Sequence, residues 1–351
     1  MTDKKKENKY EDRIGKFLTP KLDIFLFDML KDSYLEKTGY KKILSGVPLP
    51  IKSQDLGNLT NVRIAQNMAF VIGCDINFDY RDNYIDFIKS NFGEGFAKVM
   101  VGEGAKAAEN NDFETACVYF RAAILIDPEL RDGWFFYGRA ARDAYEDGES
   151  EDYIGRFKAE SLAAFEKLTI KFPDFDMGFY FLGYAYLNLG LYVKTKLTWE
   201  RFLQISDDND LKLEVDQWIE KLKEPIRIEE GCNDIIAGRY EKGIEMLQGY
   251  TVDNRFNTWW PLWFYLGHAY KETGVLDLAQ VALLKVLQLS PSNTDAMMML
   301  ADVYEELEDY DKQMKYLNKI KLVQQYHEED RLEAERQQLI RNEEKSGNTL
   351  S

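Results

Sequence analysis

The chain has 351 residues, of which 30% are charged and 45% are hydrophobic, a composition typical of folded proteins. Its formal net charge is −16 at pH 7, and no basic stripe is visible in the sequence. This balance disfavours nucleic acids and anionic membrane surfaces as partners, because both attract basic proteins.

Residues 1–13 are almost wholly polar and lack the apolar stretch of a signal peptide, so we expect a disordered tail and a cytoplasmic protein. No apolar run is long enough to span a bilayer. Cys74, Cys117 and Cys232 are far apart and without metal-binding spacing. They are therefore expected to be buried thiols in a reducing compartment, and no metal or cofactor is predicted.

Residues 14–96 contain three stripes of apolar side chains at helical spacing, at 22–30, 62–72 and 84–92. The Gly- and Pro-containing stretch 46–57 between the first two predicts an extended connector. We expect this region to form either a small helical domain or a cap docked on the segment that follows.

From residue 97 onwards one short sequence motif recurs, which we call the phrase. It consists of a bulky residue, then Leu three positions later, Gly or Ala four positions later and Tyr seven positions later. These offsets place the side chains on one face of a helix. Three copies are Phe179-Leu182-Gly183-Tyr186, Trp263-Leu266-Gly267-Tyr270 and Met297-Leu300-Ala301-Tyr304, and a fourth, Trp134-Tyr137-Gly138-Ala141, is altered.

Two further signals agree in phase with the phrase. A proline stands six residues before a copy at Pro128, Pro173 and Pro291, and proline ends helices. A small residue lies four positions before a bulky one in each intervening segment, which lets two helices approach and fills the space beyond. These pairs are Ala116/Phe120, Ser161/Phe165, Thr195/Trp199 and Ala279/Leu283.

The combined pattern resembles the tetratricopeptide repeat, a helix-turn-helix unit of about 34 residues. The resemblance covers residues 97–325 and implies six repeats in an all-α, right-handed α-solenoid with an N-terminal helical cap. We interpret the acidic segment 145–153 as a surface insertion, and the fourth repeat is degenerate. An extra helix is predicted at 211–222. Residues 326–351 are expected to form a C-terminal capping helix and a disordered tail after Lys345.

In this family, first-helix residues one and five positions after the first bulky residue commonly face a concave groove. The resemblance therefore implies that the groove is lined by Phe135, Arg139, Tyr180, Tyr184, Phe264, His268, Met298 and Asp302. One turn further along, Arg142 and Lys271 add cations at the groove edge. Aromatic rings with scattered cations favour an extended peptide or helix that carries apolar anchors and some acidic groups. Tyr180 and Tyr184 can instead pack against neighbouring helices.

The sequence holds only two histidines and no nucleophile, metal or phosphate-binding motif, so it predicts no catalytic residue and no enzyme. It predicts a cytoplasmic scaffold that binds a protein or peptide partner in the groove. A chaperone for a dedicated cargo protein is the alternative. An enzyme and a self-associating protein are further alternatives, and the oligomeric state is left open.

Overall fold

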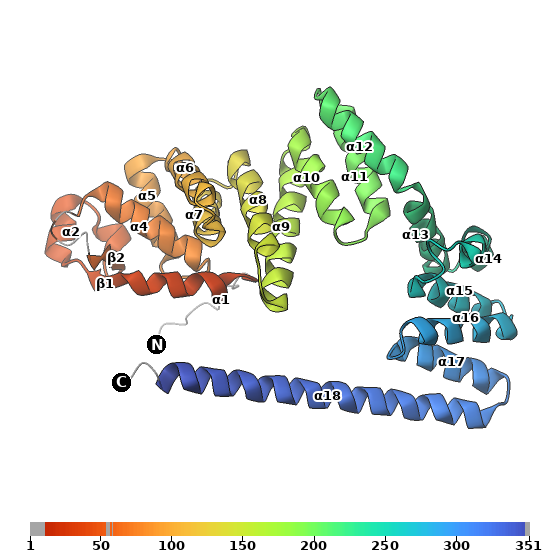
Figure 1. Cartoon of the computed structure of the whole chain (residues 1–351). Coiled ribbons are helices and arrows are strands. Elements are labelled where there is room, and N and C mark those ends of the chain that lie inside the picture. The colour runs from red at the N-terminus through yellow and green to blue at the C-terminus, as the bar shows by residue number, and fades with distance from the viewer. Residues whose placement is uncertain (1–10, 54–56, 58, 348–351) are drawn as a thin grey trace. The chain divides into compact units, whose positions relative to one another are not determined.

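The computed structural model describes residues 11–53, 57 and 59–347, and Figure 1 shows that helices dominate them. The all-α solenoid predicted from the sequence is confirmed, whereas the hand of its superhelix stays a prediction. Contacts divide the chain into two compact units, Met1–Gln217 and Trp218–Ser351. The predicted tails lie largely outside the described residues.

The first unit begins with short elements followed by two longer helices. They are α1 (Gly15–Leu18), η1 (Thr19–Ile24), β1 (Phe25–Met29), α2 (Asp32–Thr38), α3 (Lys41–Leu44), β2 (Pro48–Lys52), α4 (Asn61–Cys74) and α5 (Arg81–Phe92). The helices predicted at 62–72 and 84–92 are confirmed as α4 and α5. The helix predicted at 22–30 is wrong, because this stretch ends in strand β1.

Strands β1 and β2 form an antiparallel sheet, with Phe25 opposite Lys52 and Met29 opposite Pro48. The predicted connector 46–57 is therefore extended over residues 48–52, as expected, but it also pairs. Local periodicity missed the pairing because the partner strand lies about twenty residues away, and strand formation depends on such cross-strand contacts.

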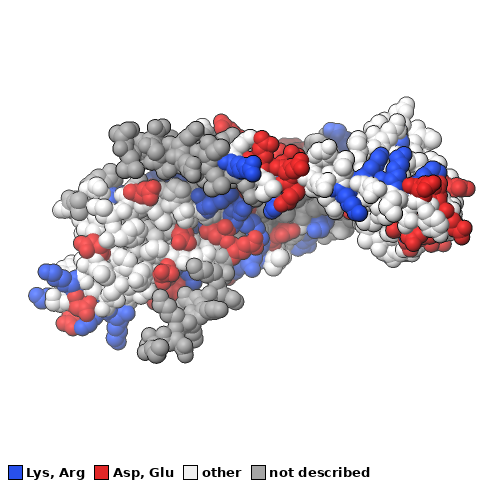
Figure 2. Space-filling view, turned by 90° about the horizontal axis from the view of Figure 1, so that it is seen from below, with Lys and Arg blue, Asp and Glu red and all other residues white. Residues whose placement is uncertain are grey.

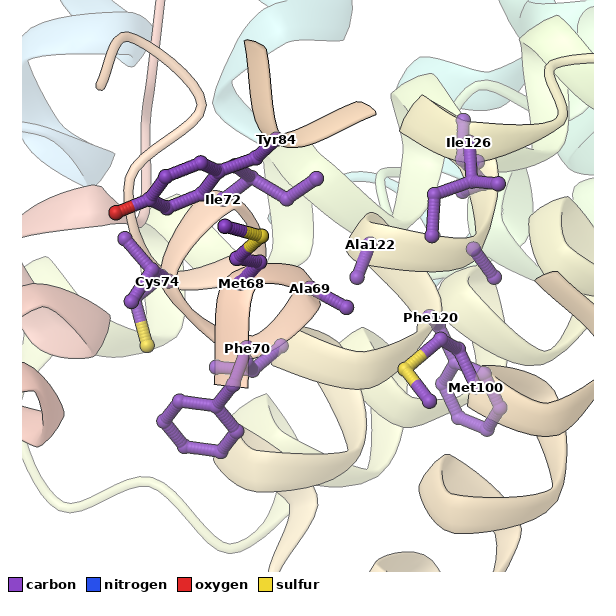
Figure 3. Close-up of a cluster of buried hydrophobic side chains, with 14 of the residues drawn as sticks. Met68, Ala69, Phe70, Ile72, Cys74, Tyr84, Met100, Phe120, Ala122 and Ile126 are labelled. Atoms are coloured by element: carbon purple, nitrogen blue, oxygen red, sulfur yellow. The ribbon is translucent and has the colours of Figure 1, made fainter. Parts of the chain in front are cut away.

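One buried cluster connects this N-terminal region with the first repeats. Figure 3 shows Met68 and Ile72 of α4 and Tyr84 of α5 in this cluster, together with Met100 and Phe120 of the following helices. Tyr84, Met68 and Ile72 are completely buried. Residues 14–96 thus share their hydrophobic core with the hairpins that follow.

Three helical hairpins complete the first unit: α6 (Phe96–Glu109) with α7 (Phe113–Ile126), α8 (Arg131–Glu146) with α9 (Glu151–Lys171), and α10 (Asp176–Leu187) with α11 (Tyr192–Ile205). In each hairpin the bulky second-helix residue packs on the first-helix glycine. The pairs are Phe120 on Gly104, Phe165 on Gly138 and Trp199 on Gly183. This close approach explains why the phrase contains glycine.

The predicted insertion at 145–153 is not a long loop. Only residues 147–150 connect α8 to α9, and the extra residues lengthen α9 to 21 residues. The added turn of α9 carries Tyr153, whose ring lies 4.8 Å from that of Phe17. Most of residues 145–153 are exposed, so the segment lies on the surface as interpreted, while Tyr153 also contacts the leading segment of the chain.

The leading segment, residues 11–18, lies against the second helices α7 and α9. The Asp12 carboxylate lies 2.6 Å from the guanidinium of the buried Arg121, and Arg13 lies 3.5 Å from Glu160. Both residues belong to the predicted tail 1–13, of which the described residues 11–13 include these two contacts with the repeats. The contacts of the leading segment described here are therefore with second helices and not with the first helices α8 and α10.

Helix α12 (Asn209–Lys221) corresponds to the extra helix predicted at 211–222 and contains the boundary between the two units. The second unit continues with α13 (Lys223–Ile236), α14 (Tyr240–Leu247), η3 (Gln248–Val252), α15 (Trp260–Glu272), α16 (Leu276–Leu289), α17 (Thr294–Glu306) and α18 (Tyr310–Gly347).

The degenerate fourth repeat is still a hairpin, α13 with α14, in which Leu247 packs on Gly231. Helix α18 passes residue 326 without a break and ends at Gly347, beyond the predicted start of the disordered tail. No helix in the described part of the chain is both long and apolar enough to cross a membrane.

Candidate partner-binding surfaces

The nine groove residues predicted from the sequence all lie on first helices of hairpins, where they are half-buried or exposed. Five of them form what we call the first face, on α8 and α10 of the first unit: Phe135, Arg139, Arg142, Tyr180 and Tyr184. The other four form the second face, on α15 and α17 of the second unit: Phe264, His268, Lys271 and Met298. Each face is a candidate surface of its own.

Aromatic rings form the base of the first face. The Phe135 ring lies 5.6 Å from that of Phe181, and the Phe181 ring stacks at 5.7 Å on Phe165 of α9. The rings of Tyr180 and Phe181 meet edge to face at 5.3 Å. Sequence reasoning missed Phe181, although its place between two groove residues of one helix was a usable signal.

Two arginines lie over these rings. The guanidinium of Arg139 is 5.7 Å from the ring centre of Phe135 and 5.5 Å from that of Phe181. Its buried Nε has no hydrogen-bond partner among the described residues. Arg142, by contrast, pairs with Asp143 at 2.6 Å. Cation–π contacts thus hold Arg139, and no carboxylate within the described residues neutralises it.

Glu214 of helix α12 contacts both tyrosines of the first face. The hydroxyl of Tyr180 donates to the Glu214 carboxylate at 3.2 Å, and the hydroxyl of Tyr184 donates to the same carboxylate. Burial is the main cause that raises the pKa of both phenols. Both rings are half-buried and also contact α11, with Tyr180 5.4 Å from Phe202 and Tyr184 5.0 Å from Trp199, contacts of the kind that the sequence left open.

The second face contains a cavity of about 280 Å³. It brings together all four predicted residues of this face, Asp302 and Met299, and adds Glu272 and Asp295, which sequence reasoning missed. Its lining is Phe264, His268, Lys271, Glu272, Asp295, Met298, Met299 and Asp302. The missed Glu272 lies four positions after His268 on α15, a helical spacing that could have pointed to it.

Charges around this cavity are unevenly distributed. The Nζ of Lys271 lies 3.5 Å from Glu272 and 3.9 Å from both Asp302 and Glu306. The Nε2 of His268 is 3.9 Å from Glu272. One lysine thus faces several carboxylates at distances longer than the roughly 2.7–2.9 Å of close charged hydrogen bonds.

An apolar rim adjoins the cavity. Met298 is 47% exposed and Trp260 is 39% exposed. The Trp260 ring lies 6.2 Å from that of Phe264, one turn along α15. Exposed aromatic and Met side chains next to charged groups are typical of surfaces that bind other proteins.

The described residues contain no group of three or more His, Cys, Asp or Glu side chains that could hold a metal ion. Burial raises the pKa of the Cys74 and Cys232 thiols to about 12, so neither is a nucleophile near neutral pH. On the face shown in Figure 2, acidic and basic side chains are interspersed.

Comparison with known proteins places the second face within recognisable repeats. Residues 261–293 and 294–325 match the family model described as tetratricopeptide repeat. These two stretches contain α15, α16 and α17 with the beginning of α18. No curated protein sequence matches the chain.

Several solved structures are similar to the chain. The TPR domain of P58(IPK) is 18% identical over 70% of this chain and 68% of that one, with a TM-score of 0.38. YrrB, described as a TPR protein with an unusual peptide-binding site, is 18% identical over 59% and 93%, with a TM-score of 0.29. The Cut9–Hcn1 assembly of the APC/C is 14% identical over 83% and 55%, with a TM-score of 0.32.

Proposed function

This chain is a tetratricopeptide-repeat protein, and we propose that it binds a peptide or helix of a partner protein on its two first-helix faces. The tetratricopeptide fold supports protein–protein interaction in general. The observation that carries the proposal is the cavity of the second face, where the four repeat positions Phe264, His268, Met298 and Asp302 line one recess. We assign the protein no catalytic activity.

The chemistry of both faces supports a peptide ligand. Each face combines aromatic rings with charged groups at the rim, the combination from which protein interfaces derive both anchoring and register. On the first face Arg139 offers a cation without a carboxylate partner in the described residues. On the second face Met298 offers an exposed apolar contact.

A chaperone for a dedicated cargo protein would use the same faces as a scaffold. The two functions differ in the partner, because a dedicated cargo is unstable or aggregates without its chaperone. Expression of the identified partner alone and together with this protein therefore separates them.

Site-specific photocrosslinking tests the proposed function. A photoreactive phenylalanine analogue is introduced singly at Phe135 or Met298, one on each face. Matched controls are Leu197 on α11 and Val281 on α16, exposed apolar side chains on second helices. The full chain is irradiated in cells that express it naturally, and adducts are identified by mass spectrometry.

We expect the same partner protein to be crosslinked from the face positions and not from the controls. Mapping of each adduct should locate, for each face separately, a short segment of the partner. Equal crosslinking from the control positions, or no adduct from either face, would contradict the proposed function.

A further inference from the structure

We propose that the cavity of the second face binds a lysine or arginine side chain of the partner, and that an apolar neighbour of this residue rests on the rim formed by Trp260, Phe264 and Met298. This inference rests on the proposed function and specifies the chemistry of the partner at one of its two faces.

Charge complementarity carries the inference. Glu272, Asp295 and Asp302 line the cavity, and only Lys271 and His268 are basic groups in its lining. Nearby Glu306 adds a further carboxylate 3.9 Å from Lys271. An acidic ligand group would meet this excess of negative charge, whereas a basic side chain complements it.

The carboxylates retain the capacity to accept hydrogen bonds. Among the described residues, Glu272, Asp295 and Asp302 accept no hydrogen bond from another side chain, and the ion pairs of Lys271 are 3.5 Å or longer. Side chains of Glu272 and Asp302 are 37% and 50% exposed. A partner's ammonium or guanidinium can therefore approach them without displacing an existing close pair.

The size and walls of the cavity fit one long basic side chain. Its volume of about 280 Å³ lies just below the range of roughly 300–1,000 Å³ that is usual for separate small-molecule ligands. Phe264, Met298 and Met299 form apolar walls on which the aliphatic stem of lysine or arginine can pack. The Phe264 ring can also attract the cation through its face.

This chemistry differs from the acidic ligand that the sequence favoured for a single groove. That expectation treated all nine residues as one surface that prefers acidic ligand groups. Two of the cations that support it, Arg139 and Arg142, lie on the first face, whereas Lys271 of the second face lies among carboxylates. The carboxylates that line the cavity of the second face were not among the predicted residues, apart from Asp302.

Selection of short random peptides on the immobilised full chain tests the inference. Enriched peptides are synthesised with a fluorophore, and their binding is measured by fluorescence anisotropy to three proteins. These are the unmodified chain, a cavity variant Glu272→Gln/Asp302→Asn, and a control variant Glu329→Gln/Asp330→Asn. The control makes the same change of charge on an exposed stretch of α18.

We expect peptides with Lys or Arg beside an apolar residue. Their affinity should fall roughly tenfold in the cavity variant, because two partly exposed ion pairs are lost, and should change less than about twofold in the control. Raising the NaCl concentration from about 50 mM to about 300 mM should weaken binding to the unmodified chain more than binding to the cavity variant. Circular dichroism and thermal unfolding confirm that each variant is folded.

The outcomes separate this inference from the proposed function. A further variant, Phe264→Ala/Met298→Ala, reports whether a peptide uses the second face at all. Peptides that it weakens, but that lack a basic residue or bind the cavity variant with full affinity, would overturn the inference and leave the proposed function standing. Failure to enrich any peptide, or peptides that no substitution on either face weakens, would contradict both.

Discussion

The first and second faces derive from the same repeated phrase, but different neighbours contact them. On the first face, Glu214 of α12 accepts hydrogen bonds from two tyrosines, and Phe181 lies beneath the arginines. On the second face, Met298 is exposed and Lys271 approaches its carboxylates only loosely. Repeat position therefore determines which helix face a residue occupies, and the helices packed nearby determine whether a partner can reach it.

The largest expected effect comes from removing the indole that fills the last hairpin of the first unit. Trp199 is completely buried, packs on Gly183, and donates its indole N–H to the carbonyl of Tyr180 at 3.1 Å. Trp199→Ala should cost about 3–5 kcal/mol of unfolding free energy, the usual range for a large buried aromatic residue. It should also disorder the first face.

Hydrogen exchange read by mass spectrometry measures this effect separately in the two units. Amides of α10 and α11 should lose protection, whereas those of α15 to α17 should keep it. Leu283→Ala is the matched substitution in the second unit and should produce the opposite pattern. Loss of protection in both units from either substitution would show that the two faces are not stabilised independently.

A smaller difference is expected from placing a methyl group on the phrase glycines. A Cβ at Gly183 would overlap the indole of Trp199, whereas a Cβ at Gly267 would lie 2.8 Å from Cγ of Leu283, a side chain that can rotate. Gly183→Ala should therefore destabilise the protein by about 1–3 kcal/mol. In Gly267→Ala, the gain of about 1 kcal/mol in helix propensity should offset much of the strain.

Urea denaturation of the two glycine variants and the unmodified chain gives the comparison. The Gly183→Ala midpoint should be the lowest of the three. The last repeat of the chain already has alanine, Ala301, at the position of the phrase glycine, so the repeat can accommodate a methyl group there. A lower midpoint for Gly267→Ala than for Gly183→Ala would contradict the assignment of Trp199 as the more rigid neighbour.

The hairpins were predictable from the sequence because their determinants are local. A glycine and a bulky residue meet across a short turn, as Gly183 and Trp199 do, so the spacing alone specifies the contact. The strand pairing of Phe25 with Lys52 was not predictable in this way, since it depends on a distant segment. The repeat pattern also does not show the contact of Tyr153, in the first turn of α9, with Phe17 of the distant leading segment.

The residues of the candidate site also fall into those that the sequence could predict and those that it could not. Repeat position gave Phe264, His268 and Met298, because each is set by its distance from a first bulky residue. It could not give Glu214, which reaches the first face from a helix outside the repeat. Nor could it show that the cavity is acidic, since that property depends on carboxylates brought together from α15 and α17.

Alkaline pH should weaken both units through their buried thiols. Burial raises the pKa of Cys74 in the first unit and of Cys232 in the second to about 12, against about 8.5 for an unfolded thiol. The folded state therefore holds a proton that the unfolded state releases. The stability that each thiol contributes is fully present below about pH 8.5 and is lost as pH rises towards 12.

At pH 10 each thiol should reduce the unfolding free energy by roughly 1–2 kcal/mol. Unfolding of Cys74→Ser and Cys232→Ser variants between about pH 7 and pH 10 should show a shallower pH dependence than that of the unmodified chain. Iodoacetamide labelling identifies the unit that opens, because the two residues lie in different units. Equal pH dependence in all three proteins would show that the thiols do not contribute.

The smallest expected effect tests the cause of the difference between the faces. Glu214→Ala removes the acceptor for Tyr180 and Tyr184, a loss of about 1 kcal/mol because the groups are only partly buried. Asp216→Ala, an exposed carboxylate on the same helix, is the control. Hydrogen exchange should increase in α12 for the first variant and not for the second.

If α12 restricts access to the first face, Glu214→Ala should also raise the crosslinking yield at Phe135 and leave that at Met298 unchanged. An unchanged yield at Phe135 would mean that the rings and arginines of α8 and α10, rather than α12, limit what the first face can bind.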